Sequence, residues 1–257
     1  YAGRADTVGL LYPYYYSKMA YDGFKSIGRD DIITLTRCAY LGSQKFGSLV
    51  WSGDIESTFE SLACQVKAGL NMSMCGIPWW NTDIGGFYGA DITSDYFKEL
   101  IVRWFQFGLF SPVMRLHGSR NRHFEPTPGL KEPSGDPNEI WSFGEKNFEI
   151  LKNLIFIREK LKPYIITQMD IASEQGYPVM RPMFFEYPDD ETCYALDSQY
   201  MFGDDIIFAP VVEQGQTKKS VYIPDGEWIL TKDKKIYTKG TYEITAEIDE
   251  FIAFVKK

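Results

Sequence analysis

Short apolar runs alternate with longer segments of helical periodicity through the first 175 residues. Apolar side chains recur at helical spacing over 11–26, 57–70, 93–109, 144–161 and 163–174. Ser57 or Thr58 and Thr93 or Ser94 are suitable N-caps, and Pro163 is expected to end one helix and open the next. The strand-like runs cover 31–36, 48–53, 72–77 and 112–116. This alternation predicts parallel strands with helices outside them.

Polar side chains follow these predicted strands at corresponding places: Arg37, Asp54, Asp83 and His117. The carboxyl ends of parallel strands meet on one face, so the four side chains are expected to converge. In a β/α barrel that face carries the active site. A doubly wound sheet would instead place them along one edge.

The stretch from Ser48 to Asp54 carries the clearest chemistry. A short apolar run turns through Ser52 and Gly53 into a lone carboxylate that follows the indole of Trp51. An indole face can cover a sugar ring, and partial burial raises the pKa of a carboxyl group, so Asp54 suits an acid that cleaves glycosides. The alternative interpretation is that Asp54 merely caps the next helix.

Other candidates also have simpler interpretations. Asp83 could shape the Gly85–Gly86 turn, and His117 could be a buried histidine with satisfied hydrogen bonds. Trp79 and Trp80 could belong to the core or form a platform for a ligand. The basic cluster 120–123 is interpreted as a solvated loop.

From about residue 176 the pattern changes to short β-rich runs separated by turn residues, such as Asp225-Gly226 and Lys239-Gly240. This pattern predicts a small antiparallel β-sandwich. We therefore expect two domains, over 1–175 and 176–257. The runs are 179–185, 206–212, 220–224, 227–230, 235–237, 241–244 and 251–255.

Composition narrows the possible partners. Aromatic residues make up 16% of the chain, with 6 Trp and 17 Tyr, which suits carbohydrate but also an aromatic core. The formal net charge of -8 argues against nucleic acid, and no apolar run approaches the roughly 20 residues that span a membrane. The two histidines and four cysteines fit no metal pattern, so no cofactor is expected. The cysteines are expected to be buried free thiols, which favours a reducing compartment weakly.

Several spaced motifs together resemble glycoside hydrolase family 31, which includes α-glucosidases and α-xylosidases. The resemblance extends over nearly the whole chain. The motifs are Trp51-Ser52-Gly53-Asp54, Gly69-Leu70-Asn71, Asp83-Ile84-Gly85-Gly86-Phe87, Arg115-Leu116-His117, Gln199-Tyr200-Met201-Phe202-Gly203-Asp204-Asp205 and Ala209-Pro210-Val211.

The resemblance implies the second half of a (β/α)8 TIM-type barrel, followed by an antiparallel β-sandwich. It implies retaining hydrolysis of terminal, non-reducing α-xylosides or α-glucosides, with Asp54 as acid/base. Arg37, Asp83 and His117 would contact the sugar hydroxyls. Trp51 and Phe87 would form the aromatic walls of the same pocket.

One part of the family pattern has no counterpart here. The family's nucleophile, in an Asp-Met-Asn-Glu-like context on an earlier strand, is not found in 1–257. We therefore expect an incomplete enzyme that pairs with the upstream half of the barrel or with a second copy, and that acts on an oligosaccharide or glycoside. The alternatives are an inactive structural or carbohydrate-binding fragment, and an α-glucan lyase of the same family.

Overall fold

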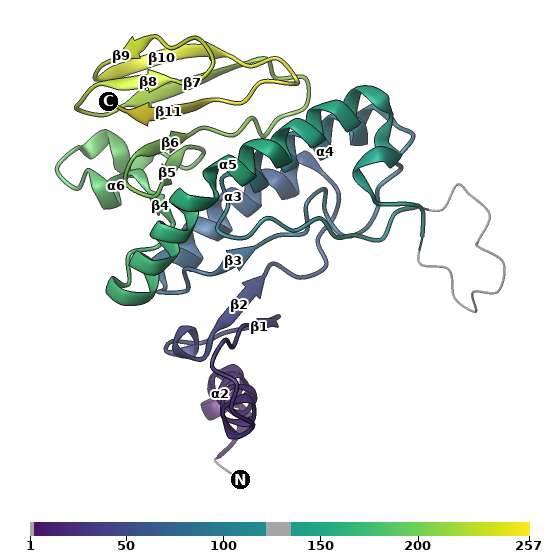
Figure 1. Ribbon diagram of the computed structural model, residues 1–257, viewed down its shortest axis with the longest axis vertical. Helices are drawn as coiled ribbons and strands as arrows, with labels where there is room; N and C mark the ends of the chain where they lie inside the picture. The colour runs from purple at the N-terminus through teal and green to yellow at the C-terminus, as the bar shows by residue number, and fades with distance from the viewer. Residues whose placement is uncertain (1–2, 122–134) are drawn as a thin grey trace.

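The structure is a computed structural model, and it describes residues 3–121 and 135–257. Figure 1 shows the chain running from helix α2 (Tyr12–Ser26) at one end of the molecule to antiparallel sheets at the other. The short helix α1 (Ala5–Val8) and the 3-10 turn Gly9–Leu11 precede α2. Between the two ends lie three parallel strands and three long helices.

The parallel sheet has the order β1-β2-β3, formed by β1 (Thr34–Thr36), β2 (Ser48–Trp51) and β3 (Trp80–Asn81). Strands predicted over 31–36 and 48–53 therefore exist, although they are shorter than expected. The run 112–116 contributes only an isolated parallel bridge, in which Ile84 pairs with Leu116. This bridge still places four parallel segments side by side in chain order.

The strand predicted over 72–77 is wrong. Met72 to Met74 complete helix α3 (Phe59–Met74), and Gly76 then turns the chain with a φ of +76°. Strand β3 forms later, at Trp80–Asn81. A short apolar run fits a buried helix end as well as a buried strand, so periodicity alone could not separate the two.

The other long helices lie close to their predicted positions. Helix α4 (Asp95–Leu109) begins at Ser94, whose hydroxyl accepts from the Phe97 amide at 3.2 Å. Helix α5 (Glu145–Gln175) packs beside α4 and continues through Pro163, so the predicted break is wrong. Apolar residues on both sides of Pro163 pack into the core, including Leu154 and Ile165, and this packing outweighs the lost hydrogen bond.

The C-terminal region forms two antiparallel sheets, which confirms the prediction of antiparallel strands there. The larger sheet has the order β4-β5-β6-β11-β8-β9, and the smaller pairs β10 with β7. The predicted run 179–185 is a strand only at its start, because α6 (Met183–Glu186) follows β4. The strands are β4 (Met180–Pro182), β5 (Tyr200–Phe202), β6 (Ile206–Phe208), β7 (Lys218–Ile223), β8 (Trp228–Leu230), β9 (Ile236–Tyr237), β10 (Gly240–Thr245) and β11 (Ala253–Lys256).

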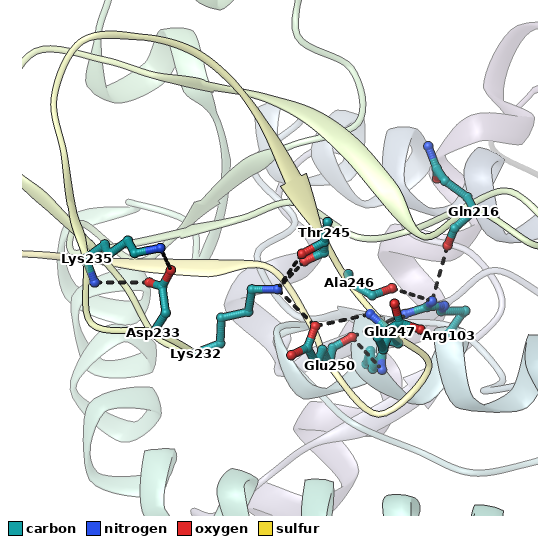
Figure 2. A network of polar contacts seen from close by, with 10 residues as sticks. Arg103, Gln216, Lys232, Asp233, Lys235, Thr245, Ala246, Glu247 and Glu250 are labelled. Atoms are coloured by element: carbon teal, nitrogen blue, oxygen red, sulfur yellow. Dashed lines mark hydrogen bonds and ion pairs between the residues drawn. The ribbon is translucent and has the colours of Figure 1, made fainter.

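A buried polar network joins α4 to the C-terminal sheets (Figure 2). The Arg103 guanidinium donates to the carbonyl oxygens of Ala246 at 3.0 Å, Glu247 at 3.1 Å and Gln216 at 3.3 Å. Gln106, one turn further along α4, donates to the Ile248 carbonyl at 2.8 Å. The loop between β10 and β11 is therefore held by side chains from α4.

The four cysteines are free, but only Cys193 is buried. The prediction of buried thiols is wrong for Cys38, Cys64 and Cys75, which are exposed on a loop, the outer face of α3 and a turn. In the part of the chain that the structure describes, no helix is long and apolar enough to cross a membrane. Among the same residues, no group of three or more His, Cys, Asp and Glu side chains could hold a metal ion.

Candidate active site

Asp54 lies just beyond the carboxyl end of β2, on the face where the parallel strands end. Its side chain is 42% exposed, and one nitrogen of Arg37 donates to both of its carboxylate oxygens at 2.9 Å. Helix α3 is instead capped by Thr58, whose hydroxyl accepts from the Ser61 amide at 3.0 Å. Asp54 therefore does not cap the helix, and its carboxylate is available at the mouth of the site.

Two cationic side chains of this face, those of Arg37 and Arg115, lie against the indole of Trp51. The guanidinium of Arg37 lies over its indole at 5.3 Å from the ring centre, and that of Arg115 lies over it at 5.9 Å. The indole thus has charged neighbours that can hydrogen-bond to hydroxyl groups of a ligand lying against it.

Asp83 forms the floor of the site. Its side chain is fully buried, and one carboxylate oxygen accepts from Arg115, while the other has no hydrogen-bond partner among the described residues. Burial raises the pKa of Asp83, opposed first by the positive charge of Arg115. The turn at Gly85–Gly86 is closed by the backbone, since the Gly86 amide donates to the Asp83 carbonyl at 2.9 Å. The turn therefore does not use the carboxylate, and its second oxygen can contact a ligand.

Phe87 and His117 complete the predicted set. Their ring centres are 5.6 Å apart, and His117 is exposed, so it is not a buried structural histidine. The Ser119 amide donates to the Phe87 carbonyl at 2.6 Å, which joins the two loops that carry these rings. Phe87 is half-buried, so part of it is accessible to a ligand.

Arg120 holds the loop after β3 in place from the interior of the protein. It is 2% exposed, and its guanidinium donates to the carbonyl oxygens of Gly86 at 2.8 Å and Ile84 at 3.2 Å. Burial lowers the pKa of Arg120 to about 10. The prediction of a solvated loop is therefore wrong for Arg120, and residues 122 and 123 of that cluster lie outside the described residues.

The structure brings five of the predicted residues into two contact groups: Arg37, Trp51 and Asp54 in one, Phe87 and His117 in the other. Arg115 joins Trp51 of the first group to the sixth predicted residue, Asp83. No role was assigned to Arg115 or Arg120 from the sequence. Arg115 could have been found from its position two residues before His117, which puts both on one side of an extended segment. Trp80 is buried in the core, which answers the open question for that residue.

The arrangement combines an accessible carboxylate, a buried carboxylate with a free oxygen, two guanidinium groups and aromatic rings. Such a set can bind a neutral polyol through both donors and acceptors. It can also transfer one proton at its mouth, through Asp54.

Comparison with known proteins identifies the family. The sequence model of the glycosyl hydrolases family 31 TIM-barrel domain matches residues 4–168, and that of the family 31 C-terminal domain matches residues 176–257. The chain belongs to glycoside hydrolase family 31. The resemblance found in the motifs is thereby confirmed.

Relatives within this family carry several activities. The chain is 36% identical over 217 residues to an α-xylosidase of Saccharolobus solfataricus, covering 84% of this chain and 28% of that protein. It is 32% identical over 251 residues to α-glucosidase 2 of Bacillus thermoamyloliquefaciens, covering 96% of this chain and 29% of that protein. The chain thus spans less than a third of the length of these curated relatives.

Solved structures agree with this assignment. A family 31 α-xylosidase from a soil metagenome, solved in complex with xylose, superposes with a TM-score of 0.91 at 44% identity. The superposition covers 96% of this chain and 38% of that one.

Proposed function

We propose that this chain supplies the acid/base carboxylate and part of the sugar pocket of a retaining α-glycosidase. The observation that carries the proposal is the position of Asp54. It is the accessible carboxylate at the mouth, beside an indole, and it does not cap the following helix. The proposed substrates are terminal α-xylosides or α-glucosides of an oligosaccharide or simple glycoside, because the relatives bear the names of enzymes for both.

In this mechanism Asp54 first acts as an acid. A nucleophilic carboxylate attacks the anomeric carbon, the glycosidic bond breaks, and Asp54 donates its proton to the departing oxygen. Asp54 is then a carboxylate and removes a proton from the water that hydrolyses the glycosyl–enzyme intermediate. Arg37 must leave Asp54 before the first step, because one nitrogen of Arg37 occupies both carboxylate oxygens and an oxygen that donates to the leaving group cannot also accept from Arg37.

The remaining side chains bind the sugar. The free oxygen of Asp83 accepts from a hydroxyl, and Arg37 and His117 serve as further contacts to hydroxyls. Trp51 and Phe87 cover the faces of the ring. Arg115 positions Asp83 by occupying its other oxygen.

We further propose that the nucleophile comes from polypeptide beyond these 257 residues, either an upstream half of the barrel or a second copy. Among the described residues β1 pairs only with β2, so its other edge is unpaired. The same end of the molecule exposes large apolar side chains, which water covers poorly. They include Leu10, Tyr15, Met19, Phe24, Ile33 and Leu35. Residues 1–175 would then belong to the barrel and 176–257 to a β-sandwich domain.

A leaving-group series tests the acid/base role in the assembled enzyme. Asp54→Asn should slow cleavage of the glycosidic bond most for oligosaccharides and least for aryl glycosides with very good leaving groups, which need little protonation; the burst of released leaving group measures this step. The matched control is Glu60→Gln, an exposed glutamate in the first turn of α3, which should leave the series unchanged. Equal loss across the series would contradict the proposal.

Product analysis separates the alternatives. Hydrolysis gives a reducing sugar whose anomeric configuration is retained, and a lyase gives an unsaturated sugar. Binding of an oligosaccharide with no product at all would indicate a binding or structural protein. Sedimentation of the isolated 257 residues tests the pairing, since a compact, heat-stable monomer would show that the open edge needs no partner.

A further inference from the structure

Two side chains at the rim, Glu56 and Tyr88, are paired beside the site but have no part in the mechanism above. Glu56 and Tyr88 form a parallel bridge, and the Tyr88 phenol donates to a Glu56 carboxylate oxygen at 3.2 Å. The Tyr88 side chain is nevertheless 45% exposed. The pair thus presents an aromatic ring and a second carboxylate oxygen to solvent in a fixed arrangement.

The backbone fixes this pair rigidly. The Tyr88 amide donates to the Ile55 carbonyl at 3.2 Å, and the Ser57 amide donates to the Tyr88 carbonyl at 2.9 Å. Gly86 lets the two loops approach, because a Cβ there would lie 2.6 Å from the Glu56 carbonyl oxygen. Arg120 bonds to both loops from below, through the Gly86 carbonyl at 2.8 Å and the Ser57 hydroxyl at 3.4 Å.

The chain places the pair next to the acid/base. Glu56 follows Asp54 by two residues, so their Cα atoms are at most about 7 Å apart. Tyr88 directly follows Phe87. Asp83 at the floor is fully buried while Asp54 is 42% exposed, so the site opens toward solvent past Asp54. Asp54 protonates the oxygen of the leaving group, so the rest of that group must lie next to Asp54 on the open side.

The chemistry of the pair suits a neutral sugar. The phenol ring offers an apolar face for sugar C–H groups, and the carboxylate oxygen that Tyr88 does not occupy can accept from hydroxyls. Loss of hydration and the nearby Glu56 charge raise the pKa of Tyr88, so the phenol stays protonated as a donor.

We propose that Glu56 and Tyr88 form the binding subsite for the sugar that departs as the leaving group. This inference rests on the proposed role of Asp54 as the acid/base. It implies that the enzyme acts on oligosaccharides, in which the leaving group is itself a sugar and not only a small aglycone.

Two substrates that share the same transferred sugar test the subsite in the assembled enzyme. One is the α-glycosyl fluoride, which has no leaving sugar, and the other is the corresponding disaccharide. Tyr88→Ala should lower kcat/KM for the disaccharide about tenfold, the size of one lost aromatic contact, and at least fivefold more than for the fluoride. Tyr88→Phe keeps the ring and should lose less, and Glu56→Gln should show the same selective loss through the hydroxyl contact.

The matched control is Tyr194→Ala, which removes a more exposed tyrosine from the C-terminal region and should change the turnover of neither substrate. Equal losses for fluoride and disaccharide, or no loss for either, would overturn the subsite. Failure of the unsubstituted enzyme to turn over the fluoride would count against the proposed function itself. In that case calorimetry still tests the subsite: Tyr88→Ala must weaken binding of the disaccharide more than of the monosaccharide.

Discussion

Arg103 couples the barrel part of the chain to the C-terminal sheets. Replacing it tests how much this contact contributes to the free energy of unfolding. The guanidinium is 2% exposed, and the carbonyl oxygens of four C-terminal residues accept hydrogen bonds from it. Arg103→Met keeps an apolar stem of similar length and removes every one of these donors. The acceptors are Gln216, Ala246, Glu247 and Glu250 (Figure 2).

Two opposing effects determine how much Arg103→Met changes the free energy of unfolding. The buried guanidinium is poorly hydrated, and this loss of hydration lowers the pKa of Arg103. Removing the charged group therefore recovers part of the free energy that its dehydration costs. Against this, each buried carbonyl left without a donor costs about 1–3 kcal/mol. The Glu250 carbonyl keeps the Gln106 amide at 3.1 Å as a donor and the Glu247 carbonyl keeps the Glu250 amide at 2.9 Å, so at most two carbonyls lose their partner. Two carbonyls at about 1–3 kcal/mol each cost about 2–6 kcal/mol, and the recovered hydration offsets part of this, so we expect a net loss of about 2–4 kcal/mol in the free energy of unfolding.

Urea unfolding followed by tryptophan fluorescence measures this loss. Trp228 is the one tryptophan of residues 176–257 and lies buried in the C-terminal sheets, so the fluorescence lost in a Trp228→Phe variant reports on those sheets. The fluorescence that remains, including that of the buried Trp104 on α4, reports on the rest of the chain. In the unsubstituted protein both probes should report one transition. In Arg103→Met the Trp228 transition should move to lower urea and separate from that of Trp104.

Arg29→Met is the control, because Arg29 is exposed and, among the described residues, forms an ion pair with the nearby Asp31 alone. It should cost less than about 1 kcal/mol. Arg103→Lys should fall between the two, since a lysine keeps the charge but cannot reach all the carbonyls. A loss below about 1 kcal/mol in Arg103→Met, with both transitions still coincident, would refute the idea of a polar link between the two parts.

Three further predictions concern stability. Burial raises the pKa of Asp83 above 3.8, so the native state binds more protons than the unfolded state just above that pH. The free energy of unfolding should therefore fall as pH rises through the raised pKa, and urea titrations of Asp83→Asn should lack this slope. Burial lowers the pKa of Lys219 from 10.5 to about 8, so Lys219→Met should raise the free energy of unfolding by about 2–3 kcal/mol at pH 7. The gain should shrink as pH rises through 8 toward 10.5, where the unfolded lysine also loses its proton. Gly86→Ala should cost more than about 1 kcal/mol by thermal unfolding, because Gly86 has a φ of +73° and its new Cβ would strike the Glu56 carbonyl.

Local signals in the sequence were sufficient for much of the fold. Thr58 and Ser94 satisfy the first amides of α3 and α4, as expected from their positions before an apolar run. The failures occur where tertiary packing decides. Packing carries α5 through Pro163, and the end of α3 extends into an apolar run that also suits a strand.

The candidate site was likewise predicted only in part from local sequence. The alternating pattern placed Arg37 and Asp54 after strands that exist as β1 and β2. It placed Asp83 after a strand at 72–77 that is wrong, and His117 after a run that forms only an isolated bridge. The sequence could not show that Arg115 pairs with Asp83, or that Arg120 is buried beneath the loops. Both facts depend on distances between segments more than 30 residues apart.

The assignment of Asp54 as the acid/base has one most direct test, chemical rescue with azide. Asp54→Ala in the assembled enzyme removes both the acid and the base. With an aryl α-glycoside that has a very good leaving group, the glycosyl–enzyme intermediate should form and then persist, since no base activates water. Azide needs no base, so it should restore turnover and give the α-glycosyl azide with retained configuration. If azide has no effect and yields no glycosyl azide, while the intermediate still forms and is hydrolysed at the original rate, Asp54 is not the acid/base.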